Sequence, residues 1–371
     1  MLLEGLHIPL TTPFNADGRV ALDKLDRNVA RYSKTPAAGL IVLGPSGEPT
    51  LLSDDETRDV LRTAAEAAAP EKILIAGIAR DSVRSVLALV DVAAELHYDA
   101  ILVGGSALDP SLISEGLKDK KEEEIRSVLI NRIEKRAHLR LPFFRVIADR
   151  SPLPIVLLSR PGRAMTAGDA SELATHPNII GIVDTHGRGE QAGWLTEQTA
   201  SIQREVTVTS NFAAVTARMK LAAEAAPAPA FLSAASLTGS ASAIAEPPAL
   251  APALRTRTKA VGFQILSGNS GSLLDALNAG ATGIAPAFAA CAPQACYEVY
   301  AAWKDGDVAL AEEKQARIRD AAALAESLGP GGLKYACDLN GYAAGLPRLP
   351  HFPPDAAQRA ALEALMHPLR N

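Results

Sequence analysis

Short apolar runs alternate with longer amphipathic segments through the first half of the chain. Between the runs, apolar residues recur three or four positions apart, as at Val83, Val86, Leu87 and Val90. A buried parallel strand shows as a continuous apolar run, and an amphipathic helix shows the 3.6-residue spacing. The alternation therefore predicts repeated βαβ units around a parallel sheet. The runs are Leu6–Leu10, Leu40–Leu43, Ile73–Gly77, Ala100–Val103, Pro154–Leu158 and Ile179–Asp184.

One of these units carries a polar loop. The run that ends at Leu43 is followed by a glycine-bracketed loop containing Ser46 and Glu48. Ser53 and Glu56 then have the spacing of a capping box, which begins a helix. We therefore expect a strand, a polar loop and a capped helix, with the polar groups at the carboxyl end of the strand.

The second half of the chain is less regular, and two segments compete for the role of seventh strand. Val206–Ser210 alternates like a strand, Gly262–Ser267 is the other candidate, and we favour the later one. Between them, residues 222–254 are rich in Ala, Pro and Ser, and their prolines rule out one long helix. This stretch is interpreted as an insertion with little order of its own, or as a lid over the site.

Two further regions depart from the alternation. Lys118–Arg140 is dense in charge and has apolar residues at helical spacing, which predicts an extra surface helix with a solvated face. After Pro286 the chain is largely helical. The expected helices there are Pro293–Lys304, Asp307–Leu328, Leu333–Asn340 and Asp355–Met366.

Composition narrows the classes of function. The net charge of -5 disfavours a nucleic-acid or anionic-membrane partner, so we expect a small-molecule ligand. The three cysteines lack Cys-x-x-Cys spacing and indicate neither a disulfide framework nor a zinc site. Met1–Phe14 has no signal-peptide pattern and no stretch of 18 apolar residues occurs, so a cytoplasmic location is expected by default.

Several motifs resemble one known family. The loop from Gly44 to Glu48 is similar to the Gly-Thr-Thr-Gly-Glu loop of the dihydrodipicolinate synthase and N-acetylneuraminate lyase family. Further likenesses are Thr11-Thr12-Pro13-Phe14, His176-Pro177-Asn178 and Leu266-Ser267-Gly268. The resemblance implies a (β/α)8 barrel, a homo-oligomer (dimer or tetramer) and chemistry on pyruvate-type 2-oxo acids through a lysine Schiff base.

The length fits a barrel with additions, because a single (β/α)8 barrel typically needs about 250 residues and this chain has 371. We expect the barrel over residues 1–290, with insertions at about 111–140 and 205–258. Residues 291–371 are expected to form a C-terminal helical extension.

The chain departs from the family where the chemistry should be. The family's Gly-Ile-Lys-Glu step corresponds to Gly181-Ile182-Val183-Asp184, and valine has no amine with which to form an imine. The family's proton-relaying tyrosine corresponds to Leu158, and its first loop hydroxyl to Pro45. Its Tyr-Tyr step corresponds to about Ser106 and Ala107. The catalytic residues are therefore unknown, and Schiff-base chemistry is expected to be lost.

Some binding features of the family survive. The resemblance makes Ser46, Gly47, Glu48, Arg163 and Thr12 the candidate substrate-binding residues. A guanidinium suits a carboxylate through paired hydrogen bonds. Two alternatives without a role in binding stay open. The Ser46 hydroxyl could form a hydrogen bond only within its own turn, and Arg163 could form a surface ion pair.

The sequence offers few residues that could replace the family's lysine or bind a metal ion. No lysine is expected at a strand end, and Lys334 is expected at the start of a late helix. A Schiff-base lysine that has moved to another position is therefore not expected. Asp184 and His186 offer only two metal ligands, so no metal site and no cofactor are predicted. In the loop after Leu266, Ser270 or Ser272 is expected to cap a helix rather than to hold a phosphate.

Two functions remain open. The first is a lyase or aldolase acting on a small 2-oxo acid or other carboxylate without a lysine imine. The second is a non-catalytic barrel that binds a carboxylate or acts as an assembly partner. An enzyme should bring an acid or base towards Ser46, whereas a degenerate barrel should fill that space with residues such as Val183 and Leu158.

Overall fold

The strands close into a barrel in the part of the chain that the computed structural model describes, residues 1–105, 141–161, 164–185, 187, 189–225 and 254–370. The order around the barrel is β1-β10-β9-β6-β5-β4-β3-β2, and every neighbouring pair is parallel. This confirms the expected (β/α)8 fold. The barrel strands are β1 (Gly5–Pro9), β2 (Gly39–Val42), β3 (Ile73–Ile78), β4 (Ala100–Gly104), β5 (Ile155–Ser159), β6 (Ile179–Asp184), β9 (Gln264–Ser267) and β10 (Gly283–Ile284).

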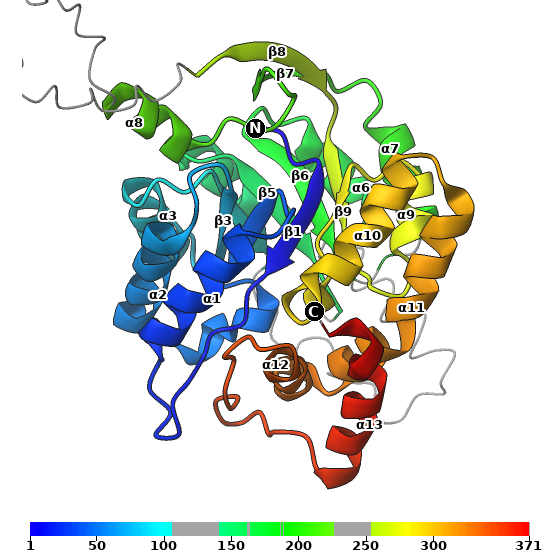
Figure 1. Ribbon diagram of the computed structural model, residues 1–371. Helices are drawn as coiled ribbons and strands as arrows, with labels where there is room; N and C mark the ends of the chain where they lie inside the picture. The colour runs from blue at the N-terminus through cyan, green and yellow to red at the C-terminus, as the bar shows by residue number, and fades with distance from the viewer. Residues whose placement is uncertain (106–140, 162–163, 186, 188, 226–253, 371) are drawn as a thin grey trace, which may run out of the picture.

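The seventh barrel strand is β9, as favoured from the sequence. All four of its residues are buried, as a barrel strand covered on both faces requires. The rival segment forms β7 (Arg204–Thr209), which pairs antiparallel with β8 (Thr256–Val261) outside the barrel. Its side chains alternate between buried and exposed, the pattern of a strand with one solvated face. Figure 1 shows this ribbon beside the N-terminus, at the amino-terminal end of the barrel strands.

Helices surround the barrel between its strands. Helix α2 begins with the expected capping box, in which Ser53 and Glu56 each bond the other's backbone N–H. The helices up to β10 are α1 (Leu22–Ser33), α2 (Asp54–Ala67), α3 (Val83–Glu95), residues 141–150, α6 (Ala167–Ala174), α7 (Gly189–Gln198), α8 (Ala217–Ala225) and α9 (Leu273–Asn278).

The chain after β10 is helical, as expected. Its helices are α10 (Pro293–Lys304), α11 (Val308–Ser327), α12 (Gly329–Leu339) and α13 (Ala356–Met366). Figure 1 shows α12 and α13 beyond the carboxyl ends of the barrel strands, where a barrel's site lies. Helix α12 begins at Gly329 rather than at Leu333, so Lys334 lies inside the helix and not at its start.

Several expectations fall on residues outside the described part of the chain. These are the insertion at about 111–140, most of the Ala/Pro-rich stretch 222–254, and Ser106, Ala107, Arg163 and His186. Among the helices that are described, none combines the length and the apolar character needed to cross a membrane.

Candidate functional site

An apolar layer lies inside the barrel near the carboxyl ends of its strands. Leu158 of β5 is in register with Val183 of β6, which is in register with Leu266 of β9. All three belong to one buried interior cluster, and Val183 is only 2% exposed. The position that the family resemblance assigns to a Schiff-base lysine is therefore part of a buried apolar layer.

Above this layer is a cavity of about 390 Å³, which we call the barrel-mouth cavity. Among the described residues that line it, four are polar and come from different parts of the fold, and the others are mainly apolar. The polar residues are Ser46 of the glycine loop, Arg160 after β5, Thr185 after β6 and Glu326 of α11. Val183 and Leu158 line its apolar part, together with Leu102, Ala285 and Leu333.

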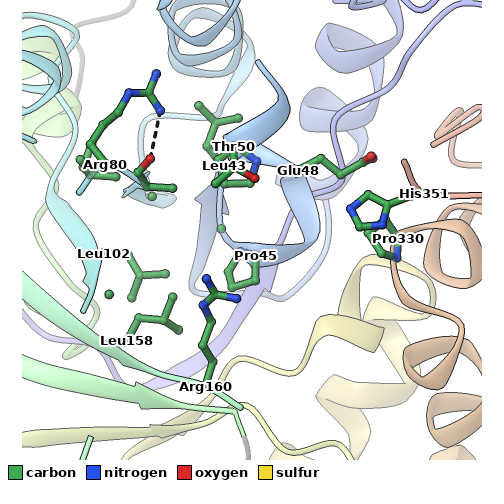
Figure 2. A pocket seen from close by; sticks show the side chains of 16 residues that line it. Leu43, Pro45, Glu48, Thr50, Arg80, Leu102, Leu158, Arg160, Pro330 and His351 are labelled. Atoms are coloured by element: carbon green, nitrogen blue, oxygen red, sulfur yellow. Dashed lines mark hydrogen bonds between the residues drawn. The ribbon is translucent and has the colours of Figure 1, made fainter. Parts of the chain in front are cut away.

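A second cavity of about 330 Å³, which we call the loop cavity, also has Pro45 in its wall. Arg80, Arg160 and His351 contribute to its wall. Figure 2 shows Arg160 rising beside Pro45, whereas Glu48 points the other way, towards His351. Of the described cationic residues, Arg160 lines both cavities. The residues that the two cavities share are Pro45, Leu102, Leu158 and Arg160.

The glycine loop has a compact backbone that depends on a close approach to β3. Leu43 and Glu48 both have left-handed backbones, with φ of 58° and 53°. A Cβ atom at Gly77 would lie 2.1 Å from the carbonyl oxygen of Leu43, so only glycine fits there. Thr12 donates a hydrogen bond of 2.7 Å to the carbonyl oxygen of Gly47. Thr12 and Gly47 therefore hold the loop in place.

Ser46 and Glu48, the two polar side chains of this loop, have different surroundings. Ser46 is buried and lines the barrel-mouth cavity. The Glu48 carboxylate accepts a hydrogen bond of 3.0 Å from the backbone N–H of Arg348. It also forms an ion pair of 2.6 Å with Lys334, and both side chains are fully buried. Glu48 is therefore bound by the C-terminal part of the chain.

Lys334 is held by the chain on several sides. Its ammonium group donates to the carbonyl oxygen of Leu346 at 3.1 Å and lies 4.1 Å from the ring centroid of Phe14. Burial lowers the pKa of Lys334, and the neighbouring Glu48 opposes that shift. Lys334 lines neither cavity, and neither does any other lysine that the structure describes. These contacts give Lys334 a structural role.

Sequence reasoning missed Glu326, the acidic residue of the barrel-mouth cavity. Its Oε1 atom accepts hydrogen bonds from the hydroxyl of Ser270 and, at 3.2 Å, from the backbone N–H of Phe288. Burial raises the pKa of the Glu326 carboxyl group, and these two hydrogen bonds oppose the rise. No sequence signal identified it, because it lies in a late helix and not at a strand end.

The expected helix caps after β9 are wrong. Ser272 occupies the N-cap position of α9, but its side chain makes no capping hydrogen bond. Ser270 is turned instead towards Glu326. Ser270 precedes the N-cap position by two residues, and α11 holds it there: its hydroxyl donates to Glu326 and its carbonyl oxygen accepts from Gln315.

Asp184 and its neighbours follow the expected strand alternation. Val183 and Thr185 both line the barrel-mouth cavity, and Asp184 is absent from its wall. The Asp184 side chain accepts a hydrogen bond from the backbone N–H of Gly187 at 3.1 Å. Among the residues that the structure describes, no three His, Cys, Asp or Glu side chains cluster as metal ligands would.

Comparison with known proteins adds an independent observation. The model of the dihydrodipicolinate synthetase family matches residues 2–104 and 252–368, which is more than half of this chain. The chain belongs to the dihydrodipicolinate synthetase family. The matched ranges contain the glycine loop, β9, and the helices that carry Glu326 and Lys334.

Two relatives of known type match this chain over different lengths. A 4-hydroxy-tetrahydrodipicolinate synthase from Acidiphilium cryptum is 25% identical over 370 residues, 98% of each chain. An N-acetylneuraminate lyase from Rhizobium meliloti is 33% identical over 187 residues, 50% of this chain and 54% of that lyase.

Solved structures agree on the fold. A prophage protein of the dihydrodipicolinic acid synthase family from E. coli K12, in complex with pyruvate, aligns with a TM-score of 0.71 at 20% identity. The alignment covers 100% of this chain and 99% of that one. At this level of identity, the likeness supports a shared fold.

Proposed function

We propose that this protein is a lyase-class member of its family that binds a small 2-oxo acid or other carboxylate in the barrel-mouth cavity and forms no imine with it. The observation that carries the proposal is the composition of that cavity. It has Arg160 and Ser46 in its wall over an apolar layer that contains Val183, the residue that the family resemblance aligns with the lysine. The family and its relatives, a synthase and a lyase, support the class.

Binding of a carboxylate is supported by the donors at the cavity wall. A guanidinium presents paired N–H groups that match the two oxygens of a carboxylate, which makes Arg160 the main anchor. The Ser46 hydroxyl, in the loop after β2, supplies a further donor at the wall of the same cavity. Arg163, which the family resemblance favoured, lies outside the described residues and stays a candidate from the sequence alone.

The alternative is a non-catalytic barrel that binds a carboxylate or serves in an assembly. The apolar layer of Leu158 and Val183 favours it, because the family resemblance aligns these two residues with the relay tyrosine and the nucleophilic lysine. Glu326 favours retained chemistry, since a carboxyl group faces the same cavity as Ser46. We therefore place the enzyme first and the binding protein second.

The test is borohydride trapping in the presence of pyruvate, followed by intact-mass measurement and peptide mapping. We expect no adduct on the wild-type protein. A stoichiometric adduct on any of its lysines would contradict the proposal and identify a migrated nucleophile. The matched control is Val183→Lys, which places an amine in the apolar layer where its pKa is lowered. We expect this variant, if folded by circular dichroism, to be trapped.

A further inference from the structure

Glu326 contributes a hydrogen-bond acceptor to the barrel-mouth cavity, whereas Arg160 contributes hydrogen-bond donors. Arg160 at the end of β5 only donates hydrogen bonds, and an ionised Glu326 only accepts them. Both line the one cavity, and apolar residues such as Leu158, Val183 and Leu333 line the wall as well. A ligand that bonds to both side chains carries an anionic acceptor group and a separate hydrogen-bond donor.

We propose that Glu326 is a specificity-determining residue whose carboxyl group accepts a hydrogen bond from a hydroxyl of the ligand, so that the cavity takes a small hydroxy acid. The inference rests on the proposed function, because it assumes that a carboxylate binds in this cavity. It adds the second functional group of that ligand and the residue that recognises it.

The Glu326 carboxyl group is held in position before any ligand arrives. Within the described residues, both of its hydrogen bonds end on Oε1, from Ser270 and from the backbone of Phe288. Ser270 is itself fixed, because Gln315 donates a hydrogen bond of 2.8 Å to its carbonyl oxygen. Ser270 is 1% exposed and Phe288 is fully buried. A carboxyl group anchored through one oxygen can present the other to a ligand without losing side-chain freedom on binding.

A hydroxyl suits this carboxyl group better than an ammonium. Burial raises the pKa of Glu326, which means that its surroundings disfavour a full charge. An ammonium would also have to be stripped of water beside the apolar residues Leu333 and Ala285. A hydroxyl loses less on desolvation, and the bond from Ser270 already shows a hydroxyl in contact with this group.

The test compares matched pairs of ligands that differ by one hydroxyl group. Affinities of the full chain for butyrate and for 2-, 3- and 4-hydroxybutyrate are measured by isothermal titration calorimetry. We expect at least one hydroxy acid to bind about tenfold more tightly than butyrate, as expected for a hydrogen bond to a charged or polar partner. Glu326→Leu should reduce that ratio to about one, and Arg160→Met should weaken both ligands while keeping the ratio.

The outcomes separate this inference from the function on which it rests. Binding of butyrate and all three hydroxy acids with equal affinity would overturn the inference alone, as would a preference that survives in Glu326→Leu. No binding of any acid would overturn the proposed function and this inference with it. Glu326→Gln, which keeps an acceptor oxygen, should retain part of the preference and guards against misfolding of the leucine variant. A purely structural Glu326 would change the melting temperature and leave the ratio untouched.

Discussion

His7 of β1 shows how a single residue can be committed to one protonation state by its place in the barrel. The side chain is fully buried, and its Nε2–H donates to the carbonyl oxygen of Leu3 at 3.0 Å. Nδ1 has no hydrogen-bond partner among the described residues. A Cβ atom at Gly39 would lie 2.6 Å from Nδ1, so the ring fits against a glycine. Burial lowers the pKa of His7 to about 4.

This depressed pKa predicts a loss of stability on acidification. The unfolded chain takes up the proton near pH 6.5, whereas the folded chain resists until about pH 4. The free energy of unfolding should therefore fall by about 3 kcal/mol across that window because of His7 alone. His7→Gln keeps a donor for Leu3 and removes the titration. Urea unfolding at pH 7 and pH 4.5 should show a smaller loss for the variant, and an equal loss would contradict the assignment.

At the scale of elements, one buried ion pair joins α12 to the glycine loop. Lys334 and Glu48 are far apart in sequence and are both fully buried, so the pair forms only when α12 docks at the barrel mouth. The contact between α12 and η1 (Pro45–Gly47) places this helix directly on the loop. The same loop carries Ser46 into the barrel-mouth cavity, so the ion pair positions a wall of the site.

Breaking this pair from one side should be costly. Lys334→Met leaves a buried carboxylate, and Glu48→Gln leaves a buried ammonium, each uncompensated. We expect either change to lower the free energy of unfolding by about 3–5 kcal/mol. The double variant should lose clearly less than the sum, because neither charge remains. Urea unfolding of the four proteins measures this, and additivity to within about 0.5 kcal/mol would show that the two groups are not coupled.

At the scale of the whole molecule, Arg348 fastens the segment between α12 and α13 to the barrel. Its guanidinium donates to the carbonyl oxygens of Gly18 and Leu51 and pairs with the Glu56 carboxylate at 2.7 Å. It also lies 4.3 Å from the ring centroid of Phe14. One side chain from the C-terminal segment therefore contacts the loops after β1 and β2.

Removing this fastening should loosen the segment. Arg348→Met loses charge-assisted hydrogen bonds, and we expect the free energy of unfolding to fall by about 1–3 kcal/mol. Backbone amides of residues 341–354 should exchange with deuterium faster than in the wild type. The control is Arg27→Met, whose exposed partner Asp23 is an i,i+4 neighbour and whose loss should cost less than about 0.5 kcal/mol. Unchanged exchange in Arg348→Met would show that other contacts hold the segment.

The local features of this protein follow from its sequence. The apolar runs located the first six barrel strands because a strand buried on both faces has few polar residues. The spacing of Ser53 and Glu56 was sufficient for a capping box, since both partners lie in one turn. The choice between β7 and β9 was also correct, and their burial patterns explain why: β7 alternates and β9 does not. The absence of an amine at Val183 needs no structure at all.

Only the tertiary structure decided which distant residues meet. The period of a helix or strand fixes which face a residue occupies, but not which other element that face will touch. Lys334 was assigned to the start of a helix, and its partner Glu48 to a ligand, because their pairing depends on how α12 docks. Ser270 was assigned to a helix cap for the same reason, as Glu326 of α11 is its actual partner. The strands and the capping box depend on residues close together in the sequence, whereas the polar lining of the cavity comes from the packing of distant elements.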